Sequence, residues 1–518
     1  MNGRRSAPAL AVIWLAFGVI FLVQCRSTDS DAAGISAVPV SSAVAEAAPV
    51  VAEPSAGSGL AVTPTLRLLV ATDLDGVLEP CGCTRDQLGG IDRLAAAIAE
   101  ERKDGVPSLL LTAGDVFFAN DAHATEPLEQ DLWRAQTLAE ILRGLRLDAA
   151  GMGPHDLARG HALLASLANQ ARFSWLGSGL LLERSQGQGL STADAIATAA
   201  LEPIQASALR TVGRLRVGIV GLLARPKPNW PHGVRGPDDP LGATLNELRK
   251  LREQHADLVV ALADASASEL AAFAERGAPD FIVASGAGLA PGATALGAAW
   301  ALTARRASQA LLVVDVWVAA PGAPFRQANS GSIDANTFTS RERTLPSTAP
   351  RDQAARASLD QLTKRVSAYN QQAYRDVAPA PVARDQAGYV GSRPCAACHT
   401  AEYLWWTQSP HARAYATLTQ RDKQFDVECV SCHVTGYGKR GGSTLTHVDP
   451  LQNVGCESCH GPGSTHILDA RPPQRFVRRV VPEKVCVPCH DAEHSAGFDY
   501  EQYRAALIAR GHGLPLGQ

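Results

Sequence analysis

The sequence predicts a multidomain protein in which an α/β layered sandwich is followed by a mostly helical, loop-rich domain. Two observations lead to this fold class. From residue 66 to about residue 345, short apolar runs alternate with amphipathic helical patterns, which is typical of helices that cover a buried sheet. Beyond residue 386 this alternation ends, and the pattern Cys-x-x-Cys-His occurs four times. A chain of 518 residues is long enough for two or three such domains.

The first 25 residues predict export. Arg4 and Arg5 precede an uncharged apolar run over residues 7–23, as in a secretory signal. The run leads to Cys25 in a context that resembles a lipoprotein signal, although Gln24 stands where a small residue is expected. An uncleaved anchor helix, for which the run is slightly short, and a soluble periplasmic form are the alternatives. We expect the protein on the periplasmic side of a bacterial membrane, with a lipid or helix anchor.

Residues 26–64 predict a flexible tether. They are rich in Ala, Val, Ser, Pro and Gly and contain few aromatic residues, so they cannot bury enough surface to become ordered. The net charge of the whole chain is −3, which gives no argument for nucleic acid as a partner.

Residues 65–345 are expected to form the α/β domain. Helical patterns lie at Ile91–Arg102 and Leu128–Arg143, and Gly144 is predicted to end the second helix. The candidate strands are the apolar runs at Leu66–Thr72, Ser108–Thr112, Leu215–Leu222, Ala256–Ala261, Phe281–Ala284 and Ala310–Val318.

Residues 346–385 predict a helical connector. A charged, amphipathic helix is expected from Arg351 to Tyr374, and a Pro-rich segment closes it. The helix either packs on the α/β domain or stands free as a spacer, and the sequence leaves both interpretations open. Residues 386–518 are expected to form the third folded part.

Polar residues follow three segments of the α/β domain. Asp73 and Asp75 end the first strand, Asp115 ends the second, and His155 and Asp156 follow in GMGPHDLARG. Carboxylates and histidines at the C-terminal ends of neighbouring strands are where an open α/β sheet builds a site. The simpler interpretation of these aspartates is that they are turn residues at strand ends.

From Leu66 to Ser340 these segments resemble the calcineurin-like metallophosphoesterases, and specifically the 5'-nucleotidase branch. In that family an Asp-x-His, a Gly-Asp, a Gly-Asn-His-Glu and two later His motifs hold two metal ions that activate water against a phosphate ester. Here Asp75 stands in place of a His, and Pro154 in place of the metal-binding Asn. The segments around Asp264 and Ser285 lie where the later His residues belong.

These losses remove most of one metal ion's ligands. The resemblance therefore implies a residual phosphoesterase site at Asp73, Asp75, Asp115 and His155, in a domain that binds or scaffolds and does not hydrolyse. A single divalent metal ion on the three aspartates remains an alternative, as does an active nucleotidase or phosphodiesterase.

Cys81 and Cys83 lie in the loop LEPCGC that follows the first strand. This loop resembles one in a secreted subgroup of the same phosphatase family. A close-pair disulfide, a metal-binding thiolate pair and two unreacted thiols remain open.

The four Cys-x-x-Cys-His motifs predict covalent haem c. The two thiols form thioethers to the porphyrin vinyl groups, and the adjoining His binds the iron. Structural zinc is the alternative, but zinc ribbons do not need a His directly after the second Cys. We therefore expect four haems, on Cys395, Cys398, His399, Cys429, Cys432, His433, Cys456, Cys459, His460, Cys486, Cys489 and His490.

From Tyr389 to the C terminus the chain resembles the cytochrome c-554 family of tetrahaem cytochromes. The resemblance rests on YVGSRPCAACH, WWTQSPHARAYATL, CVSCHVTGYGKRGG, NVGCESCHGPGSTH and FDYEQYRAALIARGH. It implies second iron ligands at His411, His466 and His512, whereas His447 and His494 do not clearly match.

The number of second ligands decides the chemistry. Two imidazoles on every iron make an electron carrier, whereas an iron with an open position binds a small ligand or substrate. Three well-placed candidates for four irons suggest one five-coordinate haem. We expect electron transfer with redox partner proteins or quinol-linked electron donors. The alternatives are a redox enzyme that acts on a small nitrogen compound at an open haem, and the active phosphoesterase above.

Overall fold

The computed structural model describes residues 62–514 except 81–86, 119–127, 158–160, 183–203, 225–233, 278, 333, 470–475, 492–493, 496 and 511. The chain divides into two compact units, residues 1–59 and 60–518, and everything described belongs to the second. The expected signal or anchor with Cys25, nearly all of the tether, and Cys81 and Cys83 lie outside the described residues.

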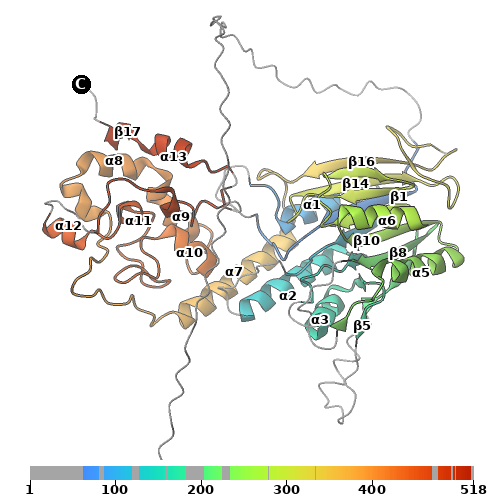
Figure 1. Ribbon diagram of the computed structural model, residues 1–518, viewed down its shortest axis with the longest axis horizontal. Coiled ribbons are helices and arrows are strands. Elements are labelled where there is room, and N and C mark those ends of the chain that lie inside the picture. Colours follow the sequence, from blue (N-terminus) through green and yellow to red (C-terminus); the bar gives the residue numbers. More distant parts are fainter. Residues whose placement is uncertain are drawn as a thin grey trace, which may run out of the picture. The chain divides into compact units, whose positions relative to one another are not determined.

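Two sheets form the centre of the α/β region (Figure 1). The first sheet has the order β15 (Arg326–Gln327), β16 (Thr337–Thr344), β14 (Ala310–Trp317), β1 (Leu66–Thr72), β2 (Ser108–Ala113), β3 (Ala149–Gly151), β4 (Ser174–Leu176) and β6 (Ile204–Gln205). The second has the order β12 (Gly292–Leu296), β13 (Ala299–Thr303), β11 (Phe281–Ser285), β10 (Leu258–Asp264), β8 (Leu215–Leu223) and β7 (Ser207–Val212). A short antiparallel pair, β5 (Leu181–Leu182) and β9 (Val234–Arg235), stands apart.

Helices cover the outer faces of both sheets. The alternation along β1 shows the layering, because Leu66, Leu68 and Val70 enter the core between the sheets, whereas Leu69 and Ala71 enter the core under the helices. The first sheet is covered by α1 (Ile91–Glu101), α2 (Leu128–Leu145), α3 (His161–Ala171) and α7 (Gln353–Ala373), and the second by α5 (Pro240–Glu253) and α6 (Ala267–Gly277). The result is the predicted α/β sandwich.

The predicted strands are confirmed with bounds that agree within three residues, and β1 agrees at both ends. The predicted end of the second helix at Gly144 is wrong. Helix α2 continues through Gly144 to Leu145, whose side chain is buried in the core, and the chain turns at Arg146 with φ 53°. Burial of Leu145 thus outweighs the weak helix propensity of the glycine.

Helix α7 packs on the α/β region, which decides between the two interpretations of the connector. Its N-cap Asp352 accepts a hydrogen bond from the Ala355 amide at 2.8 Å. The apolar stripe on its buried face consists of Ala355, Leu359, Leu362 and Val366, which join the core under the first sheet.

The same helix also contacts the C-terminal region. Asn370 is completely buried, receives a hydrogen bond from the Gln130 amide at 2.6 Å and donates one to the Phe425 carbonyl at 2.8 Å. Lys423 forms an ion pair with Glu79 at 2.5 Å, and Glu79 is also paired with Arg356 of α7. Helix α7 is therefore shared by both regions.

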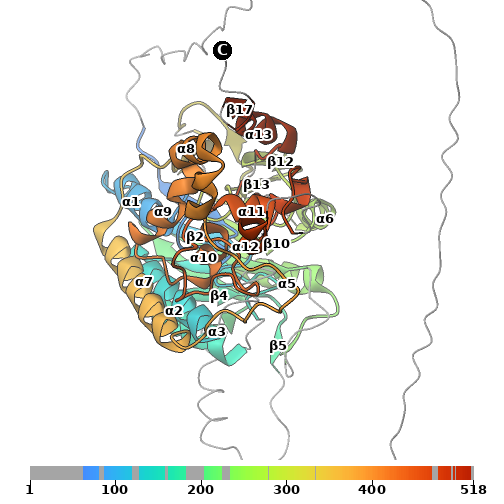
Figure 2. The same cartoon turned by 90° about the vertical axis from the view of Figure 1, so that its left-hand side faces the viewer.

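The C-terminal region, orange to red in Figure 1 and seen from another side in Figure 2, consists of short helices joined by loops. These are η1 (Arg393–Ala397), α8 (Thr400–Gln408), η2 (Pro410–Arg413), α9 (Ala414–Thr419), α10 (Val427–His433), α11 (Cys456–His460), α12 (Ser464–Leu468), η3 (Glu483–Val485) and α13 (Tyr500–Leu507), followed by the strand pair β17 (Ala509–Arg510) and β18 (Gly513–Leu514). This agrees with the expected helical, loop-rich fold.

Candidate functional site

Each Cys-x-x-Cys-His motif forms about one helical turn. The amide of His399 donates to the Cys395 carbonyl at 2.9 Å, and the amide of His490 donates to the Cys486 carbonyl at 3.0 Å. The second and third motifs end α10 and make up α11. Residues i, i+3 and i+4 of one turn share a face, so each motif presents two thiols and an imidazole on the same side.

Hydrogen bonds orient several of the imidazoles. Nδ1 of His433 lies 2.6 Å from the Ala414 carbonyl, Nδ1 of His460 lies 2.7 Å from the Arg478 carbonyl, and Nδ1 of His512 lies 2.9 Å from the Leu507 carbonyl. A carbonyl only accepts, so Nδ1 carries the proton and Nε2 keeps its lone pair. A partner on the other ring nitrogen is characteristic of histidines that bind metals.

Three pairs of histidine rings come together in the C-terminal region. The ring centroids of His399 and His466, of His411 and His490, and of His460 and His512 are each 6.2 Å apart. A metal–imidazole bond is about 2.0–2.1 Å long and the ring centre lies about 1 Å behind the bound nitrogen, so rings on opposite sides of one ion have centroids about 6 Å apart. The pairs therefore have the spacing of two axial ligands on one iron, and the motif residues fit haem.

The remaining histidines of this region have other surroundings. His447 is exposed, and its Nδ1 lies 3.1 Å from the Thr446 hydroxyl. Nδ1 of His494 lies 2.8 Å from the Asp491 carboxylate. Motif histidine His433 has no second histidine ring against it among the described residues. The second motif thus differs from the other three.

Burial favours the metal-binding form of these imidazoles. It lowers the pKa of His411, His433 and His490 below the usual range, with the neighbouring His490 adding to the effect on His411. A neutral imidazole has the lone pair that an iron needs.

The motifs approach one another in pairs. The thiols of Cys395 in the first motif and Cys456 in the third lie close enough to shift each other's pKa, and Cys489 of the fourth motif acts in the same way on Cys432 of the second. Groups attached at these sulfurs would lie close together within each pair.

Glu457, between the cysteines of the third motif, was missed by the sequence reasoning. Its side chain is buried and accepts hydrogen bonds from the amides of Val390, Gly391 and Gly463 at 2.7–3.1 Å. Burial raises the pKa of Glu457, and the three amides oppose that rise. Glu457 therefore fixes α11 against the segment that leads to the first motif. Its position inside a haem motif concealed this structural role.

A second polar cluster lies at the C-terminal ends of the strands in the α/β region. Asp73 follows β1, Asp115 follows β2, His155 follows β3, Asp264 ends β10 and Ser285 ends β11. The structure brings the sequence-predicted residues close to one another, since the charges of Asp75, Asp264 and Asp115 all act on Asp73.

Glycines allow this close approach. A side chain at Gly114, which has φ +86°, would place Cβ 2.3 Å from the Asp73 carboxylate. One at Gly153 would lie 2.4 Å from the Asp115 amide. The cluster therefore needs these glycines for steric reasons.

Each aspartate of the cluster has a protein partner. The amide of His155 donates to Asp115 at 2.7 Å, and its Nδ1 contacts the same carboxylate. The Ser285 hydroxyl contacts Asp73 and lies 3.1 Å from Asp264. Asp156 accepts hydrogen bonds from the amides of Val116, Phe117 and Gly153 at 2.9–3.2 Å.

Burial raises the pKa of Asp73 to about 7; its hydrogen bond from Ser285 opposes that shift, and the charges of Asp75, Asp264 and Asp115 add to it. Burial also raises the pKa of Asp75, and Arg306 opposes this effect.

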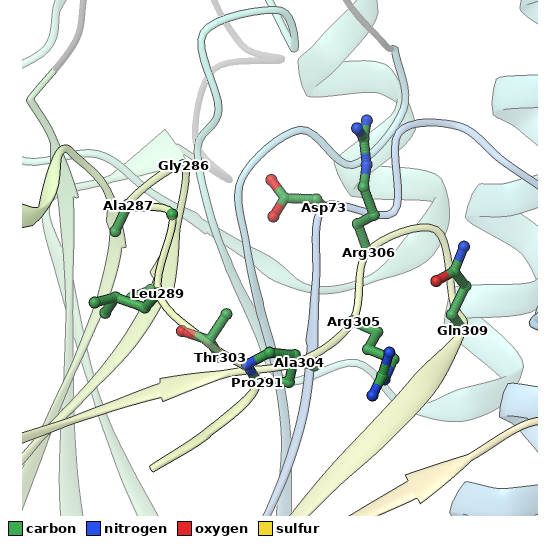
Figure 3. A pocket seen from close by; sticks show the side chains of 12 residues that line it. Asp73, Gly286, Ala287, Leu289, Pro291, Thr303, Ala304, Arg305, Arg306 and Gln309 are labelled. Atoms are coloured by element: carbon green, nitrogen blue, oxygen red, sulfur yellow. The ribbon is translucent and has the colours of Figure 1, made fainter. Parts of the chain in front are cut away.

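Arg306, which follows β13, was missed by the sequence reasoning. Its Nη2 and Nε donate to one oxygen of Asp75 at 2.7 and 3.1 Å. With Asp73, Arg305 and Gln309 it lines a cavity of about 290 Å³, whose far wall is the glycine-rich loop 286–288 (Figure 3). No local sequence motif predicts the contact of Arg306 with Asp75, because 231 positions separate the two residues.

In the described part of the chain, no group of three or more His, Cys, Asp or Glu residues is arranged to hold a metal ion. Of the helices in that part, none has the length and apolar character needed to cross a membrane.

A family model described as cytochrome c554 and c-prime matches residues 394–461. Cytochrome c-554 of Nitrosomonas europaea is 38% identical over 71 residues, which is 11% of this chain. The chain spans only 30% of that relative.

Solved structures similar to the chain include three enzymes. A 5'-nucleotidase precursor of Thermus thermophilus is 20% identical with a TM-score of 0.46 and covers 66% of this chain and 67% of its own. The sulfate thiohydrolase SoxB of Thermus thermophilus is 17% identical with a TM-score of 0.45, and the match covers 59% of this chain and 62% of SoxB. The NAD nucleotidase of Haemophilus influenzae is 15% identical with a TM-score of 0.43, and the match covers 63% of this chain and 64% of the nucleotidase.

The expected resemblance of the C-terminal region to cytochrome c-554 is confirmed by the family model and by the relative. The chain therefore joins an α/β sandwich to a region that resembles the cytochrome c554 and c-prime family over residues 394–461.

Proposed function

We propose that this chain is an exported c-type cytochrome that carries electrons through four covalently bound haems. The eight motif cysteines would attach them, and each motif histidine would be one axial ligand. A bound haem supplies an iron that changes between its ferric and ferrous forms. The protein residues hold the rings, set the histidine tautomers and exclude water. Export is supported by the sequence signal and by the need to attach haem c outside the cytoplasm.

The observation that carries this proposal is the spacing of the three histidine pairs. His466, His411 and His512 each lie 6.2 Å, centroid to centroid, from a different motif histidine. Pairing histidines from segments far apart in the sequence at one repeated distance is expected where each pair shares one ligand. Two strong imidazole donors leave an iron no open position, which suits electron transfer.

The paired motifs suggest how electrons would move. Contacts of Cys395 with Cys456 and of Cys432 with Cys489 support two close haem pairs, the first with the third and the second with the fourth. The haems held in these pairs would exchange electrons with redox partner proteins or quinol-linked electron donors outside the chain.

A second candidate function arises at the second motif. His433 lacks a second histidine ring among the described residues, so its haem would keep an open position. Such an iron binds or converts a small ligand, such as a nitrogen compound. Its proximal imidazole is held by the Ala414 carbonyl at 2.6 Å, which would keep the ring in place when a ligand binds on the other side.

Haem content and spin state test both parts. The protein, made with a c-type maturation system, should carry four haems that resist acid-acetone extraction. Electron paramagnetic resonance of the oxidised protein should show about three low-spin haems and one high-spin haem. Stoichiometric zinc without haem would overturn the cytochrome proposal, whereas four low-spin haems would remove only the second candidate.

We also propose that the α/β region does not hydrolyse phosphate esters. Pro154 stands where the related enzymes have a metal-binding Asn, and the aspartates are occupied by protein partners. Nucleotides and a generic phosphodiester should remain intact with manganese, zinc or cobalt. Enzyme-like turnover that Asp115→Asn abolishes would contradict this.

A further inference from the structure

The α/β cluster contains a positive charge supplied by the protein itself. Arg306 directs Nη2 and Nε to one oxygen of Asp75, at 2.7 and 3.1 Å. The Asp75 side chain is 7% exposed, whereas that of Arg306 is 69% exposed, so the arginine reaches from the surface to a buried carboxylate. A buried carboxylate needs a counter-charge, and a guanidinium supplies it together with directional hydrogen bonds.

The residues present do not fit the metal centre that the phosphoesterase resemblance implies. A divalent ion needs several carboxylate or imidazole lone pairs at about 2.0–2.2 Å. Here the carboxylates are hydrogen-bonded to protein groups: Asp75 to Arg306 and Asp73 to Ser285. Asp115 is hydrogen-bonded to both the amide and the Nδ1 of His155. In agreement, no metal-binding group of three residues occurs among the described residues.

One atom retains the character of a metal ligand. His155 is 7% exposed, and its Nε2 is buried with no hydrogen-bond partner. An imidazole held at Nδ1 by a carboxylate, with Nε2 unused, is the arrangement that metal sites employ. The cluster thus combines a remnant of metal coordination with an arginine that supplies the positive charge.

We propose that Arg306 is the built-in cation of this cluster, so that the α/β region is stable without a divalent metal, and that removing Arg306 turns the cluster into a divalent cation site. The freed Asp75, next to Asp73 and Asp115, would then provide the negative charge that attracts the ion. This inference is independent of the haem chemistry proposed above.

The test is binding of Mn²⁺ to the full-length haem protein, with free Mn²⁺ counted by its room-temperature paramagnetic resonance signal. Wild type should leave the signal unchanged at equimolar concentration. Arg306→Ala should bind one Mn²⁺ at least about tenfold more tightly than wild type. Arg306→Lys, which keeps the charge, should behave like wild type.

Arg305→Ala is the matched control. Arg305 lines the same cavity but pairs with Glu342 at 3.0 Å, whereas Arg306 pairs with Asp75. Its loss should therefore produce no Mn²⁺ binding. Adding Asp75→Asn to Arg306→Ala should abolish the gained affinity, which would assign the new site to this carboxylate.

Two results would overturn the proposal. One is stoichiometric Mn²⁺ binding by wild type at micromolar concentration; the other is a folded Arg306→Ala variant with no gain in affinity. If Arg306→Ala does not fold, Arg306→Gln replaces it. The wild-type measurement decides the metal-free part of the proposal in either case, and haem spectra stay unchanged throughout.

Discussion

In the α/β region, apolar side chains fill the space between two sheets and beneath the helices, whereas the described part of the C-terminal region buries one small apolar cluster. That cluster consists of Tyr415, Leu418, Val430, Val434, Leu445 and Val448. Large apolar side chains of the same region are exposed, among them Leu404 at 56%, Val480 at 73% and Leu468 at 86%. Leu468 lies two residues after the candidate ligand His466.

The difference shows that the two regions use different sources of stability. An apolar core of the first kind is sufficient for a domain. A region with so small a core needs covalent or metal-based support, as small disulfide-rich and metal-binding domains do. Four attached haems would give that support, since each is a large apolar ring fixed at two sulfurs and an imidazole.

The largest expected effect comes from withholding haem. Without a c-type maturation system, the C-terminal region should remain unfolded while the α/β region folds, because only the latter has a full apolar core. Limited proteolysis should then leave a resistant fragment that ends after α7. A chain that resists protease over its whole length without haem would show that the comparison is wrong.

Truncating a core residue of the α/β region should destabilise that region and leave the C-terminal region unaffected. Phe281 is fully buried between the sheets, so Phe281→Ala should destabilise the α/β region by about 3–5 kcal/mol. It should leave the four haem spectra unchanged. The exposed Leu404 gives the comparison variant. Leu404→Ala should not measurably change the denaturant concentration at which the α/β region unfolds.

Removing a second axial ligand should affect one haem in four. His411→Ala, His466→Ala and His512→Ala should each convert one low-spin haem to high spin and raise its potential, because loss of an imidazole donor favours ferrous iron. The exposed His447 is the control, and His447→Ala should leave the spectrum alone. A spectral change in His447→Ala together with a silent His411→Ala would reverse the ligand assignment.

A smaller effect concerns the ion pairs that join the regions. Burial alone would raise the pKa of Glu79, but Lys423 and Arg356 outweigh it and lower that pKa from 4.5 to about 2. A carboxyl with a lowered pKa stabilises the fold fully above pH 4.5 and loses this contribution as the pH falls through 2. Glu79→Gln should therefore cost on the order of 1–3 kcal/mol at pH 6 and less at pH 3.

Denaturant unfolding of wild type and Glu79→Gln at the two pH values measures this difference. The exposed pair of Glu100 with Lys103 provides the control, since Glu100→Gln should change stability by about 0.5 kcal/mol or less at either pH. An equal cost of Glu79→Gln at pH 6 and pH 3 would mean that the carboxylate charge has no part in the contact.

Local sequence patterns predicted the features that depend on neighbouring residues. The apolar run of β1 and the four haem motifs are contiguous, so their bounds could be read directly. Strands β3 and β4 have three residues each, which is too short for a recognisable alternation. The second-ligand candidates came from the family resemblance, because periodicity does not connect helices that are distant in sequence.

In the α/β cluster, too, the sequence predicted local features but not the contacts between distant segments. Asp73, Asp75, Asp115 and His155 were predicted from strand ends, and the structure brings them together. What the sequence did not reveal is their partners, because the contact of Arg306 with Asp75 depends on how the two sheets face each other. A pattern of residue types identifies candidate ligands but does not show which of them are already neutralised.

The shared position of α7 determines where this chain can be divided. Asn370 is completely buried between the Gln130 amide and the Phe425 carbonyl, so separating the regions removes the Phe425 carbonyl to which its buried amide donates at 2.8 Å. A gene fragment that stops before residue 353 would lack α7. It would therefore also expose the apolar surface of the sandwich that this helix covers. Recombination that exchanges the haem region for another module must therefore keep α7 with the sandwich and supply a new surface for its C-terminal turn.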